Sequence, residues 1–422
     1  MLGKEKTCMA EIKTFRAVRP AEGMAQKIAA LPYDVYNRQE AREQVQGDRD
    51  TFLRIDRPET QFSQEYDMYA PEVYQKARSL FEEMEQDGRY IEDSDDCYYI
   101  YQLTMEGRVQ NGIVACASID DYMNGVIKKH ENTREEKEQD RIRHVDCMNA
   151  QTGPIFLAYR ANEMLRKVVA EACKEQPLYD FTSEDAITHR VFKIDRKEQI
   201  DTIRETFHNM EQIYIADGHH RAASAVKVGL QRRKEHPDYD GTEEFNYFLA
   251  VLFPDEELKI LPYNRVVADL NGLTKEAFLE QVAQSFEVKE CERPVAPKEK
   301  AVFGMYLDQR WYELQAKESV KSTDPVEGLD VSILQNALLG PVLGIHDPRT
   351  DKRIDFVGGI RGLAELERRC REDMKLAFSM YPTSIGELFA VADAGRLMPP
   401  KSTWFEPKLR SGLFIHKLER EE

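Results

Sequence analysis

Alternating apolar and polar positions predict the strands of this chain, and three- and four-residue apolar spacings predict its helices. Two alternating runs within residues 98–118 flank Glu106-Gly107, a pattern typical of a β-hairpin. Between residues 200 and 210 the apolar residues recur at helical spacing, and a β-prone run begins at Ile213. Alanines then continue at helical spacing. This order of strand, helix, strand and helix predicts an α+β or α/β layer.

We expect an α+β fold in which a mixed sheet is flanked by helices. Residues 245–253 and 258–267 read as two further strands. The segment 269–274 contains Asn271-Gly272, a turn signal, and is the expected boundary between domains. The prediction is therefore an N-terminal α+β domain over residues 1–270 and an additional α+β unit over residues 271–422.

Composition narrows the class of protein. The chain has 422 residues, 41% of them hydrophobic, and a formal charge of −17. A net charge of this sign argues against nucleic acid or a membrane surface as partner, except at a locally basic pocket. The N-terminal residues 1–17 contain no apolar run typical of a signal peptide. Seven scattered cysteines favour neither a disulfide framework nor a zinc knuckle, so we expect a cytoplasmic protein.

Residues 213–224 are the most informative segment. The strand-like run ends at Asp217-Gly218, and His219, His220 and Arg221 precede an alanine-rich helical stretch. Glycine accepts a positive φ, and the first turn of a helix offers unpaired N–H groups that bind anions. Arginine adds a fork of donors suited to phosphate oxygens. The segment predicts an anion-binding loop, such as a site for a phosphate chain.

Other interpretations of the same loop stay open. Asp217 either orients an imidazole or caps the helix by accepting an N–H bond. The two histidines, being consecutive, are expected to point to different sides, and each is able to contact phosphate or, when neutral, a metal ion. The simplest alternative is a helix cap with solvated histidines.

The chain resembles the bacterial and archaeal family known as domain of unknown function 1015. The signature Asp217-Gly218-His219-His220-Arg221 carries the resemblance first. Further blocks resemble the family in the same order, so that nearly the whole chain is covered. They are Phe15 to Pro20, Leu31-Pro32-Tyr33-Asp34-Val35, His130-Glu131-Asn132-Thr133, Leu261-Pro262-Tyr263-Asn264-Arg265, and the segment from Met398 to Lys408.

The Gly-His-His-Arg loop is also similar to the nucleotide-phosphate loop of the ParB and sulfiredoxin superfamily. That superfamily includes kinases that phosphorylate free L-serine with ADP or ATP. Pro32-Tyr33-Asp34 resembles their Pro-His-Glu segment, which carries a catalytic carboxylate, although Tyr and Asp replace His and Glu. The resemblance implies a ParB/sulfiredoxin-like region around the loop and Mg²⁺ with ATP or ADP as cofactor.

Candidate site residues follow from these patterns. Asp34 is either functional, as a general base or as a ligand of Mg²⁺ bound to phosphates, or a turn-forming residue. His220 is the second catalytic candidate. His130 and Glu131 precede a highly charged stretch up to residue 145, which reads as a solvated helix or as a mobile lid. The predicted phosphate ligands are Asp217, Gly218, His219, His220, Arg221, Lys401, Ser402 and Thr403, and the predicted substrate ligands are His130, Glu131, Asn264 and Arg265. For these last two an ordinary surface strand end is the alternative.

The sequence thus favours a nucleotide-dependent phosphotransferase acting on a small hydroxylated metabolite, with free L-serine as the first acceptor to consider. Its partners would be a nucleotide and a small molecule. Two other functions remain open. One is a non-catalytic nucleotide-binding regulatory protein, and the other is a metal-dependent hydrolase that uses His219, His220 and carboxylates as ligands.

Overall fold

The computed structural model describes residues 9–419, and the chain divides into two compact units. Unit 1 comprises Met1–Leu258 and Pro407–Glu422, and unit 2 comprises Lys259–Glu406. Residues 1–8, on which part of the N-terminal interpretation rests, lie outside the described residues. None of the helices within residues 9–419 is long and apolar enough to span a bilayer.

The first and last strands of unit 2 explain where the chain divides. Strand β13 (Lys259–Leu261) pairs antiparallel with β20 (Trp404–Glu406), so the two ends of unit 2 lie side by side. Sequence analysis placed a single boundary within residues 269–274 and assigned residues 407–422 to the second unit. The structure differs because Pro262 ends β13 and separates it from β14 (Tyr263–Val267), and because the described residues after Glu406 return to unit 1.

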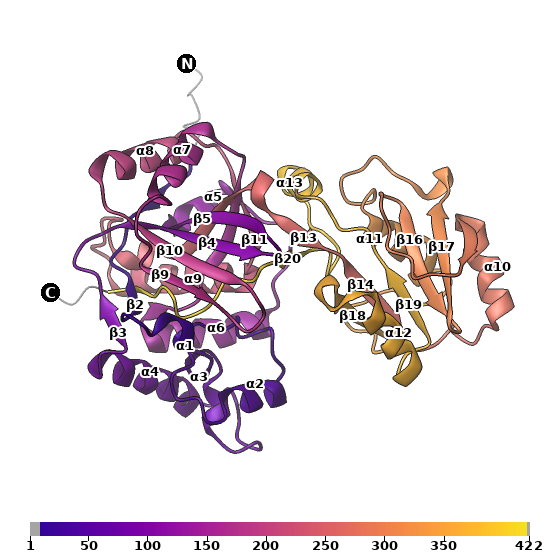
Figure 1. Ribbon diagram of the computed structural model, residues 1–422, viewed down its shortest axis with the longest axis horizontal. Coiled ribbons are helices and arrows are strands. Elements are labelled where there is room, and N and C mark those ends of the chain that lie inside the picture. Colours follow the sequence, from indigo (N-terminus) through magenta and orange to yellow (C-terminus); the bar gives the residue numbers. More distant parts are fainter. Residues whose placement is uncertain (1–8, 420–422) are drawn as a thin grey trace. The chain divides into compact units, whose positions relative to one another are not determined.

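A nine-stranded mixed sheet forms the centre of unit 1, which confirms the α+β class (Figure 1). Its strand order is β6-β11-β8-β12-β5-β4-β10-β9, and β1 pairs with β5. The β6–β11 and β8–β12 pairs are parallel and the remaining pairs are antiparallel. The strands are β1 (Ile12–Lys13), β4 (Tyr98–Met105), β5 (Arg108–Ser118), β6 (Ile127–Lys128), β8 (Ile155–Tyr159), β9 (Tyr179–Thr182), β10 (Thr188–Ile194), β11 (Ile213–Asp217) and β12 (Tyr247–Pro254). The hairpin predicted around Glu106-Gly107 is the β4–β5 pair.

Both faces of this sheet are buried. Phe248, Ala250 and Leu252 of β12 join an apolar core with residues of helices α5, α7, α8 and α9. On the opposite face Phe414, from the C-terminal segment, contacts the rings of Tyr99 and Tyr101. The helices of unit 1 are α1 (Ala25–Ile28), α2 (Arg38–Val45), α3 (Leu53–Asp56), α4 (Pro71–Gln86), α5 (Ile119–Asn124), α6 (Glu135–Met148), α7 (Glu163–Ala172), α8 (Lys197–Phe207) and α9 (His219–Glu235).

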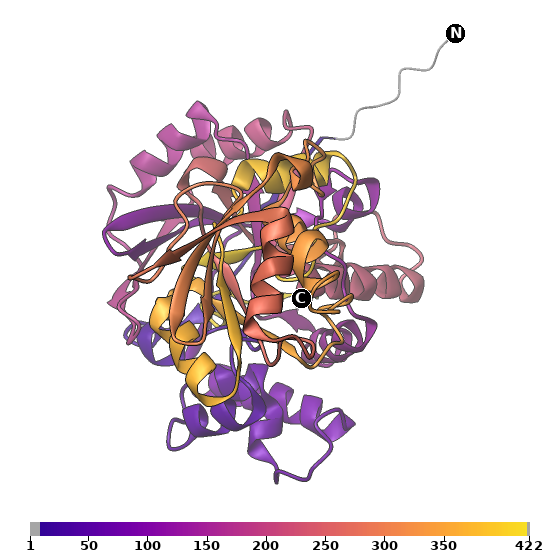
Figure 2. The ribbon, with the colours of Figure 1, turned by 90° about the vertical axis from the view of Figure 1, so that its right-hand side faces the viewer.

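The N-terminal helices α1 to α4 form a layer of their own, indigo to violet in Figures 1 and 2. Its core joins Ile28, Phe52, Leu53 and Phe81 to Ile415 of the C-terminal segment. In the C-terminal segment strand β21 (His416–Lys417) pairs with β7 (Ala150–Gln151). The remaining short elements of unit 1 are β2 (Val18–Pro20), β3 (Tyr90–Glu92), η1 (Pro58–Gln61), η2 (Glu244–Asn246) and η3 (Asp255–Glu257).

Unit 2 is built on a six-stranded sheet with the order β15-β17-β16-β19-β14-β18. All of its strand pairs are antiparallel. Helix α12 packs on the sheet through Leu366, which joins Val266, Tyr306 and Ala377 in an apolar core. The elements not yet given are α10 (Lys275–Ser285), β15 (Phe286–Cys291), β16 (Val302–Leu307), β17 (Arg310–Ala316), η4 (Glu318–Val320), α11 (Asp330–Leu334), the π-helical η5 (Gln335–Leu339), β18 (Ile354–Gly358), η6 (Gly359–Arg361), α12 (Gly362–Glu372), β19 (Leu376–Ser379) and α13 (Ile385–Asp393).

Candidate functional site

The turn between β11 and α9 is the centre of the candidate site. Strand β11 ends at Asp217, Gly218 has φ 92° and ψ 32°, and α9 begins at His219. This left-handed conformation is one that glycine adopts without strain. The Gly218 N–H donates to Asp217 Oδ1 at 2.8 Å. Ala222, Ala225 and Val226 lie in the core and hold the first turns of α9 against the sheet.

Asp217 is paired with a lysine from the end of the chain. Lys408 Nζ donates to Asp217 Oδ2 at 2.9 Å, and the aspartate side chain is about a third exposed. Burial alone would raise the pKa of Asp217, but the attraction of Lys408 and Arg221 outweighs burial and holds this pKa below its usual range. Asp217 is therefore an anion at neutral pH that organises two cations beside the turn.

Arg221 lies directly against Gly218. A Cβ atom built on Gly218 would be 3.0 Å from Arg221 Nη2 and 3.1 Å from its Nε. Arg221 Nη1 also donates to the Pro154 carbonyl at 2.7 Å. The guanidinium thus covers the turn, and the absence of a side chain at position 218 makes room for it.

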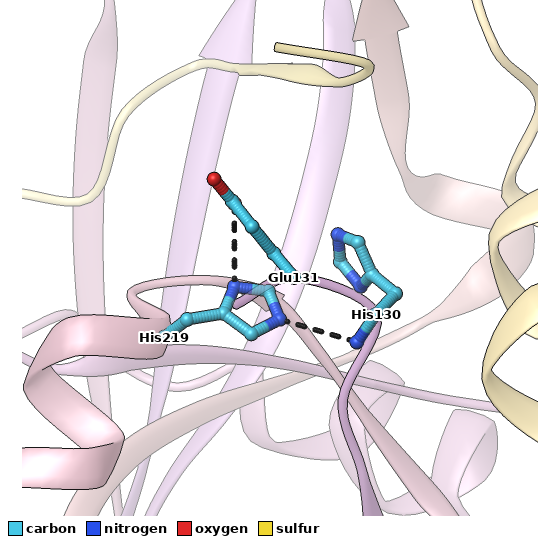
Figure 3. A group of neighbouring side chains, drawn as sticks. All are labelled: His130, Glu131 and His219. Atoms are coloured by element: carbon cyan, nitrogen blue, oxygen red, sulfur yellow. Dashed lines mark hydrogen bonds and ion pairs between the residues drawn. The ribbon is translucent and has the colours of Figure 1, made fainter. Parts of the chain in front are cut away.

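His219 is in contact with His130 and Glu131, as Figure 3 shows. The two imidazole rings are 4.4 Å apart between centroids at an interplanar angle of 88°. The backbone N–H of His130 donates to His219 Nε2 at 3.5 Å, and Glu131 Oε2 lies 3.8 Å from His219 Nδ1. Burial lowers the pKa of His130 to about 4 and holds the pKa of His219 well below its ordinary value. Both rings are therefore neutral at pH 7.

His220 has different neighbours from His219. Burial lowers the pKa of His220, Lys137 lowers it further, and the carboxylates of Glu138 and Asp34 act in the opposite direction. The His220 carbonyl accepts a hydrogen bond from Ser224 Oγ at 2.7 Å. The consecutive histidines thus belong to two environments, one beside the His130-Glu131 segment and one facing Asp34 and α6.

Two adjoining cavities of unit 1 lie beside Arg221 and Asp34. The smaller, about 30 Å³, is lined by Arg221, and the larger, about 200 Å³, is lined by Asp34. Both are also lined by Tyr33 and Arg141. The residues of the smaller cavity are Tyr33, Asp56, Arg141, His144, Val145, Gln151, Thr152, Gly153, Ile155, Arg221, Ala225, Leu249 and Ser411. Those of the larger are Tyr33, Asp34, Tyr36, Arg57, Pro58, Glu59, Met68, Tyr69, Val73, Tyr74, Lys137, Asp140 and Arg141.

Residues of a buried polar network on α6 line both cavities, and the sequence pattern does not predict this network. The Arg141 guanidinium lies 4.1 Å from the centroid of the Tyr33 ring and donates to Asp140, while Tyr74 donates to Asp140 at 2.9 Å. Glu138, Arg141 and His144 are all buried. The interpretation of residues 130–145 as a solvated helix is therefore wrong for this face. These three residues recur every third position, which is a helical spacing, but all of them are polar, so hydrophobic patterning does not detect the buried face.

The remaining predicted ligands lie in unit 2, where Arg265 contacts Lys401. Asn264 Oδ1 accepts from the Met380 N–H at 3.0 Å. Arg265 is buried and donates to the Lys401 carbonyl at 3.1 Å, and burial lowers its pKa to about 10. The Lys401 ammonium lies 5.4 Å from the Tyr263 ring centroid. Ser402 Oγ donates to the Pro399 carbonyl at 2.6 Å. Thr403 immediately precedes β20. A role for these residues in ligand binding stays a prediction.

Comparisons with known proteins add the following findings. The sequence profile of a family described as "Protein of unknown function (DUF1015)" matches residues 12–332. No curated protein matches the chain. Similar solved structures include a free serine kinase in complex with AMP (13% identity, TM-score 0.35, 70% of this chain and 86% of that chain). Others are a conserved hypothetical protein from Pyrococcus furiosus (13%, 0.34, 71% and 93%) and SbnI with C-terminal truncation from Staphylococcus aureus (11%, 0.38, 69% and 82%). At these values we draw no function from the likeness.

Proposed function

The chain belongs to the DUF1015 family, as its sequence blocks predicted, and we propose that it is a nucleotide-dependent phosphotransferase acting on a small hydroxylated metabolite. One observation carries the proposal: Arg221 and Asp34 line two adjoining cavities that share Tyr33 and Arg141. An anion-binding cation and a carboxylate suited to act as a base are thereby brought close together.

The phosphate end of the proposed site is the turn at Gly218. The first N–H groups of α9 have no partner within the helix and carry about half a positive charge. Arg221 and Lys408 add two cations next to this helix start, within a protein of net charge −17. Such a local concentration of donors suits the transfer of a phosphoryl group, in which catalysis is mainly positioning and charge neutralisation. His219 and His220 would act as further phosphate ligands.

The acceptor end is the cavity beside Asp34. Its volume of about 200 Å³ suits a small metabolite, and Lys137 and Arg57 line it together with four tyrosines. Asp34 is exposed, so its carboxylate is in contact with solvent. We assign it the role of general base toward the acceptor hydroxyl. Free L-serine is the first acceptor to test, because the loop resembles that of the free-serine kinases.

The carboxylates beside this cavity fit a Mg²⁺–nucleotide complex. Mg²⁺ prefers a few carboxylate oxygens together with phosphates and water, and it would neutralise charge on the transferred group. Asp34 offers an exposed carboxylate, whereas Asp217 already accepts from Lys408 and from the Gly218 N–H. Asp34 is therefore the residue of this chain best placed to hold the ion in the proposed site.

Nucleotide binding and phosphoryl transfer are separately testable. We expect calorimetry to show binding of ATP or ADP with Mg²⁺, and Arg221→Ala to weaken it at least about tenfold. Arg204→Ala, which removes an exposed helix arginine, is the matched control. Product formation is measured by mass spectrometry over a panel of hydroxylated metabolites that includes L-serine.

Asp34→Asn is expected to lower kcat by about 100-fold or more while nucleotide affinity measured without Mg²⁺ changes little, since a base acts only in the chemical step. Asp95→Asn, at another exposed turn, is its control. Nucleotide binding without any product would support the non-catalytic regulatory protein instead. Binding that is the same in wild type and Arg221→Ala would contradict the proposed phosphate site.

A further inference from the structure

The pairing of β6 with β11 brings two distant segments together. These strands are parallel neighbours, with Ile127 opposite Ile213, so their carboxyl ends lie at the same edge of the sheet. His130-Glu131 follows β6 by one residue, and His219 follows β11 and Gly218. In Figure 3 the Glu131 carboxylate and the His130 imidazole both lie above the His219 imidazole. One possible ligand atom from each residue lies within 4.8 Å of those of the other two.

The state of these side chains suits metal coordination. The imidazoles of His130 and His219 are both buried. Within residues 9–419 the Nδ1 atom of His130 is buried and has no hydrogen-bond partner. A buried polar atom in this condition calls for an explanation, and an ion that binds there is one. The Glu131 side chain is exposed and its carboxylate already lies 3.8 Å from His219 Nδ1.

We propose that His130, Glu131 and His219 form a binding site for one divalent transition-metal ion, with Zn²⁺ as the ion expected to bind most readily in vitro. Two imidazole nitrogens and one carboxylate oxygen are a ligand set typical of Zn²⁺ and Fe²⁺, whereas Mg²⁺ and Ca²⁺ prefer oxygen ligands. Three protein ligands leave at least one position open for water or a ligand oxygen. His220 takes no part, because its neighbours are Asp34 and α6.

The distances require a small rearrangement. Ligand atoms around tetrahedral Zn²⁺, at bond lengths of about 2.1 Å, are separated by about 3.4 Å. The three ligand atoms lie within 4.8 Å of one another, so binding requires the side chains to approach more closely, and Glu131 is the exposed one of the three. Asp217 adds negative charge near His130, while Lys129 and the positive end of α9 oppose a cation. We therefore expect affinity in the micromolar range rather than the tight binding of a structural zinc site.

The metal site shares His219 with the proposed phosphate ligands, but metal binding is measured without nucleotide and is therefore tested separately from phosphotransfer. The full-length protein is first freed of metal with a chelator and then titrated with Co²⁺, whose visible absorption reports nitrogen and oxygen ligation. We expect one equivalent of Co²⁺ to bind, and one equivalent of Zn²⁺ to displace it. Calorimetric titration of the metal-free protein with Zn²⁺ gives the stoichiometry, because an ion bound with micromolar affinity would be lost on desalting.

Matched variants assign the ligands. His219→Gln and Glu131→Gln are each expected to weaken Zn²⁺ binding at least about tenfold. His220→Gln, at the adjacent histidine, and Glu136→Gln, an exposed glutamate at the start of α6, should bind as wild type does. Because Glu131 is exposed, its substitution tests the site even if a change at His219 disturbs folding. Absence of stoichiometric binding to wild type, or equal loss in His219→Gln and His220→Gln, would overturn the proposal.

Discussion

Gly218 determines how Arg221 is placed. With φ at 92° a non-glycine residue would be strained, by about 1 kcal/mol or more in the left-handed region. A Cβ atom would in addition lie 3.0 Å from the Arg221 guanidinium. The same residue thus serves both the sharp turn and the close approach of a cation to the helix start.

Gly218→Ala is accordingly expected to lower the free energy of unfolding by about 1–2 kcal/mol and to weaken nucleotide binding. Urea denaturation and calorimetry measure the two effects. Gly125→Ala is the matched control, since Gly125 has φ 77° but nothing within 4 Å of an added Cβ. It should lose similar stability and keep its affinity. If Gly218→Ala leaves nucleotide affinity unchanged, the prediction that Arg221 contacts the nucleotide would be wrong.

At the scale of elements, the hydrophobic pattern of the sequence predicted those helices and strands whose positions depend on local periodicity. The β4–β5 hairpin and the helix after Asp217-Gly218 lie where the sequence placed them. Helix α6 was not recognised as a packed element, because hydrophobic patterning detects only apolar faces. Its buried face instead carries Glu138, Arg141 and His144, which are tolerated because each has a polar or aromatic partner. Glu138 pairs with Lys227, His144 hydrogen-bonds the Ile55 carbonyl, and Arg141 pairs with the neighbouring Asp140 and lies over the Tyr33 ring.

The Glu138–Lys227 pair tests how α6 is held against α9. Burial would raise the pKa of Glu138, but hydrogen bonds from Lys227 and Thr133 hold it below its ordinary value. A lowered carboxylate pKa contributes stability above the unfolded-state pKa, near 4.3, and this contribution is lost as pH falls through the lowered value. The pair should therefore stabilise the fold at neutral pH and lose its effect in acid.

We expect a double-mutant cycle with Glu138→Gln and Lys227→Met to give a coupling free energy of about 1 kcal/mol at pH 7, since Lys227 is half exposed and solvent screens the pair. The coupling should diminish as the pH falls below about 4. The exposed Lys174–Glu171 pair on α7 is the control, with coupling of at most about 0.5 kcal/mol. Urea unfolding of each variant provides the energies. Coupling that does not change with pH would contradict the electrostatic origin.

At the scale of the whole molecule, the sequence predicted the α+β class and two units but not their limits. The described C-terminal residues belong to unit 1 through contacts such as Lys408–Asp217 and the pairing of Ile415 with Val18. No local pattern shows which sheet such a segment joins, because its partners lie hundreds of residues away. The same limitation applies to the His130–Glu131–His219 cluster, which depends on the β6–β11 pairing.

Unit 2 is continuous in sequence, and its ends meet in the β13–β20 pair. It has its own antiparallel sheet and apolar core. A chain of residues 259–406 is therefore expected to fold alone and to unfold in one cooperative transition, as small domains do. Circular dichroism during urea titration measures this. As a control, a chain of residues 271–422 follows the boundary first inferred from sequence. It lacks β14, the strand between β19 and β18, and should not fold cooperatively.

Because Leu258 and Pro407 flank the paired strands β13 and β20, a short Gly-Ser linker should join them without strain. Unit 1 with this linker retains its nine-stranded sheet, the Gly218 turn, Asp34 and the three proposed metal ligands. If these residues suffice, the linked protein should bind Mg²⁺–nucleotide and Zn²⁺ with affinities within about threefold of the full chain. A protein that folds cooperatively, keeps Zn²⁺ binding and loses nucleotide binding would instead assign an essential ligand to unit 2, where Lys401 and Arg265 are the residues to substitute next.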